Sequence, residues 1–428
     1  METVNRPVAR TGSPRGERAR HPVVLQVLPA LEAGGVERGT VEITAAIVEA
    51  GGTALVASAG GRMVREIERA GGTHLQLPLR GKSPWTIWRN AGRLARLIRA
   101  HGVDIVHARS RAPAWSAWLA AQRTGVRFVT TWHGVYGESL PGKHRYNAVM
   151  ARGERVIAIS DFVARRVAAE YGVGPDRLRT IPRGAELSAF DPGEVPADRR
   201  RALAADWNLP AGASVIMLPG RITGWKGHGL LIEALARLPR EAGEWICLLV
   251  GPEQDGGGAA QRLLQQASKL GLGGKLRFTG LFDDMPTAYA LADLVVVPSL
   301  KPEPFGRVVV EAQAMERPVV VAAHGGAMET VEHGVSGYLF DPGDPQALAE
   351  TIAHVLRMSA EQRRHLGYWA RQNVAGRFTT HAMQQATLDV YRELLPPARQ
   401  FPAQAGAGRP SAAHHAGDGP GACFPTAA

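Results

Sequence analysis

The architecture of the chain is read most directly from residues 294–323, LVVVPSLKPEPFGRVVVEAQAMERPVVVAA. The valine-rich runs at its two ends have the composition of buried strands, and VVVEAQAM between them fits a helix. Two prolines and Gly306 place Glu303 in a loop, so the helix is expected to start near Arg307 or Val308. The order strand, helix, strand predicts one βαβ unit of a parallel sheet.

The same rhythm runs through most of the sequence. Short apolar runs bounded by Gly, Pro or Asp alternate with amphipathic stretches, as in a doubly wound α/β sheet. The first set of runs begins at Val23, Ala54, Thr73, Asp104, Arg127, Arg155 and Leu178. The second set begins at Ser214, Trp245, Lys275, Leu294, Pro318 and Gly337. A connection rich in Pro, Asp and Gly separates the sets, so we predict two similar Rossmann-like α/β domains.

This division predicts five segments. The first domain should span residues 21–190 and the second residues 191–378. A C-terminal helix, 379–396, is expected to pack back on the first domain. Residues 1–20 and 397–428 have few large apolar side chains to offset the entropy of ordering, so we expect them to be disordered.

Composition places the chain among globular proteins. Of 428 residues, 45% are hydrophobic and 21% charged, which excludes fibrous and wholly disordered classes. No apolar run reaches the roughly 18 residues that span a bilayer, and the N-terminus lacks the apolar segment of a secretory signal. Cys247 and Cys423 give neither a disulfide framework nor a Cys-based zinc site. We therefore expect a cytoplasmic protein.

Positive charge is concentrated in the first half. The formal net charge is +11, and residues 21–190 hold 23 basic and 13 acidic side chains, against 22 and 24 in residues 191–428. This asymmetry favours an anionic partner, either lipid headgroups or nucleic acid, and a solvated Arg-rich surface is the alternative. The chain has no helix-turn-helix, zinc or base-stacking signature, so we expect no nucleic-acid partner.

The segment Arg80–Gly102 is a candidate for contact with an anionic membrane surface. It carries six Arg or Lys, no acidic residue, and Trp85 and Trp88. Helical spacing places three apolar residues on one stripe: Leu94, Leu97 and Ile98. An interfacial helix and a core-facing helix with a charged outer face both fit this pattern. Membrane contact would make the protein peripheral on the inner face of the cytoplasmic membrane.

Candidate site residues are sought in the loops that follow strands, because ligands of open α/β sheets collect at strand carboxyl ends. Gly34 and Gly35 follow the first strand, where bare backbone can approach an anion at a helix N-terminus. Arg221 and Lys226 in LPGRITGWKGHG could clamp a diphosphate. Neither loop matches G-x-G-x-x-G or the P-loop, which argues against nicotinamide cofactors and P-loop ATP hydrolysis.

Two glutamates, Glu303 and Glu311, form the most specific pattern. Even in an unbroken helix the two carboxylates would stand about 12 Å and about 80° apart, too far to hold one small group. With Glu303 in a loop and Glu311 in a helix, we expect them to accept hydrogen bonds from different parts of one extended ligand. Between them, the amides of Phe305, Gly306 and Arg307 are expected at a helix N-terminus, suited to a phosphate or sugar oxygen.

These features resemble the retaining glycosyltransferases of family 4, whose GT-B architecture has two Rossmann-like domains facing across a cleft. The resemblance covers about residues 22–395 and rests on AGGVERGT, TTWHGVYG, VIAISDF, IPRGAELSAFDP, GRITGWKG, LLVGPEQ, LRFTGLFDDMPTAYALADLVVVPS and the two-glutamate segment. It implies transfer of a sugar from a nucleotide-sugar donor to a lipid-linked or polysaccharide acceptor, as in lipopolysaccharide or other envelope glycan biosynthesis. A nucleotide-sugar epimerase of the same fold and a basic nucleic-acid-binding protein are the alternatives.

The resemblance implies roles for residues of the second domain. Arg221 and Lys226 would hold the donor diphosphate, and Glu311 the ribose hydroxyls. Glu303 and the backbone of Phe305–Arg307 would hold the donor sugar. The cations would stabilise the leaving diphosphate, and the acceptor would attack from the same face, giving retention.

Three positions of the first domain enter through the same resemblance. Gly35 would approach the phosphates or the acceptor. His133 would lie beside the donor sugar as a fourth catalytic residue with Glu303, Arg221 and Lys226. Arg183 stands where many relatives carry Asn, which suggests an anionic acceptor.

Two further features complete the expectations. Pro304 departs from the family's Glu-Gly-Phe-Gly and removes one N–H donor beside the sugar. No Asp-x-Asp occurs, and the adjacent pair Asp283 and Asp284 fits a structural loop, so we expect neither an essential metal nor another cofactor.

Overall fold

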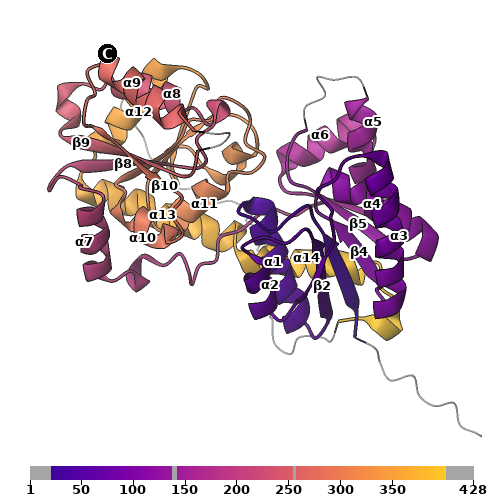
Figure 1. The fold of residues 1–428 in the computed structure, drawn as a ribbon. Helices are drawn as coiled ribbons and strands as arrows, with labels where there is room; N and C mark the ends of the chain where they lie inside the picture. The colour runs from indigo at the N-terminus through magenta and orange to yellow at the C-terminus, as the bar shows by residue number, and fades with distance from the viewer. Residues whose placement is uncertain (1–20, 137–141, 254–256, 402–428) are drawn as a thin grey trace, which may run out of the picture.

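The computed structural model describes residues 21–136, 142–253 and 257–401. It contains two domains, each with one parallel sheet and helices on both faces, which confirms the predicted fold class (Figure 1). The segment 1–20 and residues 402–428, both expected to be disordered, lie outside the described residues, as does Cys423.

The first domain has a seven-stranded sheet in the order β3-β2-β1-β4-β5-β6-β7, with all neighbours parallel. Its strands are β1 (Val23–Val27), β2 (Thr53–Ser58), β3 (Thr73–Gln76), β4 (Ile105–Ala108), β5 (Arg127–Trp132), β6 (Arg155–Ala158) and β7 (Leu178–Thr180). The winding reverses beside β1, between β1 and β4, and each strand coincides with a predicted apolar run.

Alternate residues of these strands feed two cores, one on each face of the sheet. Leu25 belongs to the core that contains side chains of α3, α4 and α6, whereas Val24 belongs to the core of α1 and α14. The helices are α1 (Gly35–Glu49), α2 (Val64–Arg69), α3 (Pro84–His101), α4 (Arg111–Thr124), α5 (Lys143–Asn147), α6 (Asp161–Tyr171) and α14 (Thr380–Arg392).

The second domain has a six-stranded parallel sheet in the order β10-β9-β8-β11-β12-β13. Its strands are β8 (Ser214–Pro219), β9 (Trp245–Val250), β10 (Leu276–Gly280), β11 (Leu294–Val297), β12 (Val319–Ala322) and β13 (Tyr338–Phe340). Its helices are α7 (Ala197–Asp206), α8 (His228–Leu235), α9 (Ala259–Lys269), α10 (Met285–Leu291), α11 (Arg307–Ala314), α12 (Pro345–Arg357) and α13 (Ala360–Arg377).

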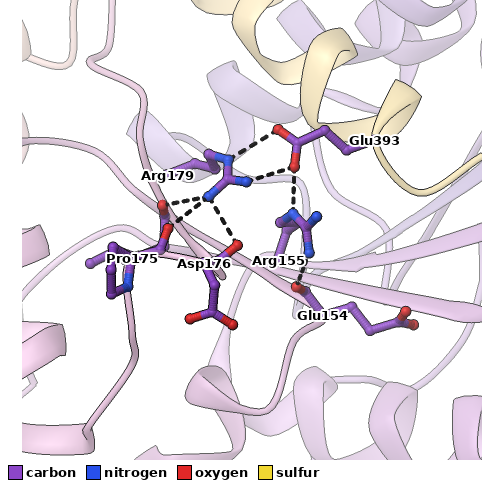
Figure 2. A network of polar contacts seen from close by, with 7 residues as sticks. Glu154, Arg155, Pro175, Asp176, Arg179 and Glu393 are labelled. Carbon is purple, nitrogen blue, oxygen red and sulfur yellow. Dashed lines mark hydrogen bonds and ion pairs between the residues drawn. The ribbon is translucent and has the colours of Figure 1, made fainter.

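The chain returns to the first domain after α13. In Figure 1, α14 lies in yellow among the indigo elements of the first domain. Beyond its C-terminal end, Glu393 binds two arginines of the first sheet, at 2.5 Å from Arg155 Nε and 2.8 Å from Arg179 Nη2 (Figure 2). Apolar side chains of α14 complete the core on the α1 face.

The ordered chain extends further than the sequence indicated. Disorder was expected from residue 397, but Pro397–Arg399 forms a 3-10 helix and Phe401 is only 4% exposed. The Phe401 ring lies 6.4 Å from that of Tyr391. One large aromatic side chain buries enough apolar surface to hold residues 397–401 in place. The Pro- and Ala-rich composition of the segment gave no sign of this.

Candidate active site between the two domains

The two domains meet through loops that follow their strands. Ser160 Oγ, after β6, donates a hydrogen bond of 2.6 Å to the carbonyl oxygen of Pro304, in the loop between β11 and α11. A Cβ atom on Gly134, after β5, would lie 3.4 Å from Pro304 Cγ. The loop of Glu303 therefore lies against the loop of His133. We call this meeting of strand ends the interdomain site.

The structure brings Lys226 and Glu303 into direct contact. Lys226 Nζ lies 2.6 Å from Glu303 Oε1, which also accepts a 2.6 Å hydrogen bond from Ser299 Oγ. Glu303 is 6% exposed, so the carboxylate is held by charged and polar partners largely out of water. A Cβ on Gly227, whose φ is +77°, would overlap the carbonyl oxygen of Pro298. Only glycine lets the Lys226 loop close on the end of β11.

Arg221 acts on the other domain. It is exposed, and its charge acts on Glu37 in the first turn of α1. Burial raises the pKa of Glu37, and the positive charge of Arg221 partly opposes that rise. A Cβ on Gly35 would meet no atom within 4 Å, so the space before it is open. Arg221 and the start of α1 thus approach the interdomain site from different domains.

Glu311 is held by two side chains. It accepts hydrogen bonds from Arg307 Nε at 2.8 Å and from Tyr289 Oη at 3.2 Å. Arg307 Nη2 also lies 2.6 Å from Glu42 Oε1, on α1 of the first domain. Burial lowers the pKa of Arg307, but the charges of Glu42 and Glu311 outweigh burial and raise it above its ordinary value. The Arg307 side chain therefore links the two domains.

Phe305 and Gly306 shape the loop before α11. Phe305 is 3% exposed, and its ring lies 5.7 Å from that of Phe378, at a steep angle. Gly306 caps α11 with φ +92°, and the helix begins at Arg307, one of the two expected positions. The Phe305 side chain is thus part of the core, and its backbone is what remains for contact with a ligand.

His133 contacts Arg183, the residue that departs from the family pattern. Arg183 Nη2 lies 2.5 Å from His133 Nδ1. Because arginine only donates, Nδ1 must accept, which places the ring proton on Nε2. Burial, followed by the charges of Arg183 and Arg109, lowers the pKa of His133 well below its ordinary value. The ring is therefore neutral at pH 7 and carries its proton on the other nitrogen.

Several partners of these residues were not selected from the sequence. Arg109, Ser160 and Ser299 each follow a strand by one or two residues, so the rule that pointed to Arg221 could also have found them. Glu42 and Tyr289 lie inside helices, where a glutamate or tyrosine has the pattern of an ordinary surface or core residue.

The adjacent aspartates have structural roles. Asp284 caps α10 and pairs with Arg199 at 2.7 Å. Asp283 pairs with Arg62 of the first domain at 2.9 Å. Within the described ranges, no group of three or more His, Cys, Asp or Glu is arranged to hold a metal ion. A site without an essential metal stays a prediction.

The basic segment Arg80–Gly102 divides into two parts. Leu94 and Ile98 of α3 are buried in the core, as expected for a core-facing stripe. Trp85 and Trp88 are 64% and 54% exposed, and their rings stack at 5.3 Å. They border a hollow of about 690 Å³ whose other apolar walls are Pro84, Ile87, Trp115, Leu119 and Tyr146. Over the part of the chain that is described, no helix is long and apolar enough to cross a bilayer.

Family models match both domains. The model described as Glycosyltransferase Family 4 matches residues 33–189, and that of Glycosyl transferases group 1 matches residues 199–373. D-inositol 3-phosphate glycosyltransferase of Mycobacterium tuberculosis (strain ATCC 25618 / H37Rv) is 31% identical over 328 residues, 70% of this chain. The match spans 65% of the length of that relative.

Solved structures extend the likeness to the whole fold. A glycosyltransferase from Rickettsia africae ESF-5 is 34% identical, with a TM-score of 0.81 over 88% of this chain and 99% of that chain. Anabaena Alr3699/HepE, solved in complex with UDP and glucose, is 25% identical, with a TM-score of 0.77 over 87% of this chain and 100% of that chain. The two family models, and the extent and identity of these matches, show that the chain belongs to the family 4 glycosyltransferases, with the GT-B fold.

Proposed function

We propose that this protein is a retaining glycosyltransferase that transfers a sugar from a nucleoside-diphosphate sugar to a lipid-linked or polysaccharide acceptor, in lipopolysaccharide or another envelope glycan. The observation that carries the proposal is the contact of Lys226 with Glu303 where the strand ends of both domains meet. Anabaena Alr3699/HepE, also solved with UDP-glucose, supports a nucleotide-sugar donor and makes UDP-glucose the first donor to test.

In this proposal, each side chain acts on a defined part of the reaction. The bond from the sugar to the diphosphate breaks, so negative charge grows on the phosphate and positive charge on the sugar ring. Lys226 and Arg221 stabilise the phosphate, while Glu303 and Glu311 accept hydrogen bonds from sugar and ribose hydroxyls. His133 donates from Nε2 beside the sugar. The acceptor hydroxyl attacks from the same face and gives its proton to the leaving phosphate, without a metal or other cofactor.

Replacement of the ammonium group tests this assignment. We expect Lys226→Ala to reduce turnover of UDP-glucose, or of whichever nucleotide sugar is the donor, by about 10²–10³-fold, as loss of a transition-state donor does. Release of nucleoside diphosphate, with and without acceptor, measures turnover and separates transfer from acceptor-independent epimerisation. Lys275→Ala is the control, because Lys275 pairs with Glu244 on the surface of the same domain. Unchanged turnover of Lys226→Ala with intact fold would contradict the proposal.

We further propose that the protein is cytoplasmic and attaches peripherally to an anionic membrane surface through Arg80–Gly102. The exposed Trp85 and Trp88 next to six basic residues, with no acid in the segment, support this partner. Contact there would leave the interdomain site in the cytoplasm and bring it near a lipid-linked acceptor.

A further inference from the structure

Two arginines of the first domain are buried beside His133. Arg109 is 2% exposed and Arg183 is 6% exposed. Arg109 directly follows β4, His133 directly follows β5, and Arg183 lies shortly after β7. The three side chains thus come from the carboxyl edge of one parallel sheet, where ligands of open α/β sheets bind.

Neither arginine is paired with a carboxylate within the described residues. Arg109 Nε donates to Gln26 Oε1 at 3.0 Å. Arg183 donates to His133 Nδ1 at 2.5 Å and contacts Met383 Sδ at 3.2 Å. An amide, a neutral imidazole and a thioether accept hydrogen bonds but do not compensate charge, and a buried cation without a counter-charge is costly.

Nearby carboxylates do not close this gap. The charge of Glu42 attracts both arginines, but Glu42 and Glu311 are already bound to Arg307. These three arginines therefore face two glutamates, and one positive charge remains in excess. Burial, and then the charge of Arg109, lowers the pKa of Arg183 to about 9. Guanidinium groups stay protonated in proteins, so both arginines are charged at pH 7 and repel each other in a medium of low polarity.

Two glycines make room for the Arg183 side chain and its loop. A Cβ on Gly39, in α1, would lie 2.5 Å from Arg183 Nη1. A Cβ on Gly184 would overlap the carbonyl group of Thr379. The Arg183 side chain therefore lies against a glycine of α1, and its loop lies against the segment that leads into α14. Glycine at both places is what allows this close packing.

We propose that Arg109 and Arg183 bind a phosphate group of the acceptor, beside His133 at the interdomain site. Guanidinium groups present planar sets of N–H donors that match phosphate oxygens, and a phosphate would supply the missing negative charge. The inference rests on the proposed function, because the donor occupies the second domain and leaves this sheet edge to the acceptor. It specifies a phosphorylated acceptor, either a soluble sugar phosphate or a lipid-linked phosphate.

The test measures binding of inorganic phosphate by thermal shift, with saturating UDP occupying the donor side and sodium chloride matching the ionic strength. We expect phosphate to raise the melting temperature of the wild type, and its apparent affinity to fall by about tenfold or more in Arg183→Asn. The shift caused by UDP alone should be unchanged. Arg65→Asn, which removes one exposed charge from α2, should behave as the wild type.

A second variant moves the guanidinium without removing it. Gly39→Ala suits a helix and leaves the charge in place, but its Cβ must displace Arg183 Nη1, so phosphate affinity should fall while stability holds. Absence of a phosphate shift in the wild type, or an equal shift in both variants, would overturn the inference. Arg183-dependent phosphate binding without binding of any nucleotide sugar would instead contradict the proposed function. Glucose 6-phosphate and a short-chain phosphatidic acid then distinguish the two sources of phosphate.

Discussion

His228 lies two residues after Lys226 and is 2% exposed. Neither of its ring nitrogens makes a well-formed hydrogen bond in the described part of the chain, and the backbone of Thr223 nearby opposes the pKa shift only weakly. Burial, and then the charge of Lys226, lowers the pKa of His228 to about 4, so the ring is neutral in the folded protein at pH 7. In the unfolded chain the ring takes up a proton below about pH 6.5. Acid therefore favours the unfolded state between about pH 6.5 and pH 4.

We expect His228→Leu to weaken this acid sensitivity. Between pH 7 and pH 5 the wild type should lose about 2 kcal/mol more unfolding free energy than the variant, because only its unfolded state gains this proton. Urea unfolding at the two pH values measures the difference. His381→Leu, on an exposed position of α14, is the control and should keep the wild-type dependence. An equal loss in wild type and His228→Leu would show that the ring is already protonated or solvated.

At the scale of one element, α3 combines two surfaces. Ser83 caps its first turn by accepting from the Thr86 amide, and Gly102 ends it in the left-handed conformation. Between these caps one stripe enters the core, while the first turns expose the stacked tryptophans. The helix is thus anchored along its length and free at its N-terminal end to contact another surface.

We expect the double variant Trp85→Ala, Trp88→Ala to lose about tenfold or more in binding to anionic liposomes, since burial of one large apolar side chain contributes about 1.5–3 kcal/mol. Co-sedimentation with vesicles containing phosphatidylglycerol measures binding. Trp369→Ala is the control, because Trp369 is also exposed, at 45%, but lies on α13 of the second domain. Binding that survives the double variant would place the membrane contact elsewhere.

Sequence patterns predicted the positions of individual strands and helices better than any other part of the fold. Each strand of both sheets falls on a predicted run. The central strands are apolar throughout because helices cover both of their faces, whereas the edge strands β3 and β7 are only partly buried. The start of α11 followed from the proline and glycine before it. Phe401 was missed because its burial depends on Tyr391 and α1, which no local pattern near residue 401 reveals.

At the scale of the whole molecule, the domains are joined by a charged contact between α1 and α11. Arg307 binds Glu42 of the first domain and Glu311 of its own helix. These side chains are largely withdrawn from solvent, so removal of one partner leaves an uncompensated charge at the domain boundary.

A double-mutant cycle over Glu42→Gln and Arg307→Gln tests this contact. We expect the two changes to be non-additive, with a coupling energy of about 1–3 kcal/mol in urea unfolding, because each removes the same interaction. A parallel cycle over Arg166 and Glu170, an i,i+4 pair within α6, should give about 0.5 kcal/mol or less. Additive effects of Glu42 and Arg307 would mean that the domains are held together by other contacts.

The sequence predicted which residues of each domain belong to the candidate site, but not which of them touch. Glu303, Lys226 and Arg221 follow strands of a single sheet, so strand ends selected them. That Lys226 binds Glu303, and that Arg307 reaches Glu42, depends on how loops close and domains meet, and no spacing within the sequence determines either. Arg183 was selected because it departs from the family pattern. Its spatial neighbour Arg109 was not selected, because it follows a different strand and the sequence does not show that the two side chains meet.

The return of α14 to the first sheet has a consequence for synthesis of the protein. Residues from Ser214 to Arg377 supply the second sheet without interruption, so this half can fold while translation continues. The first sheet, although made earlier, lacks part of the core on its α1 face until residues up to Phe401 have left the ribosome exit tunnel. We therefore expect the N-terminal domain to complete its core after the second domain, although N-terminal domains usually fold first during synthesis.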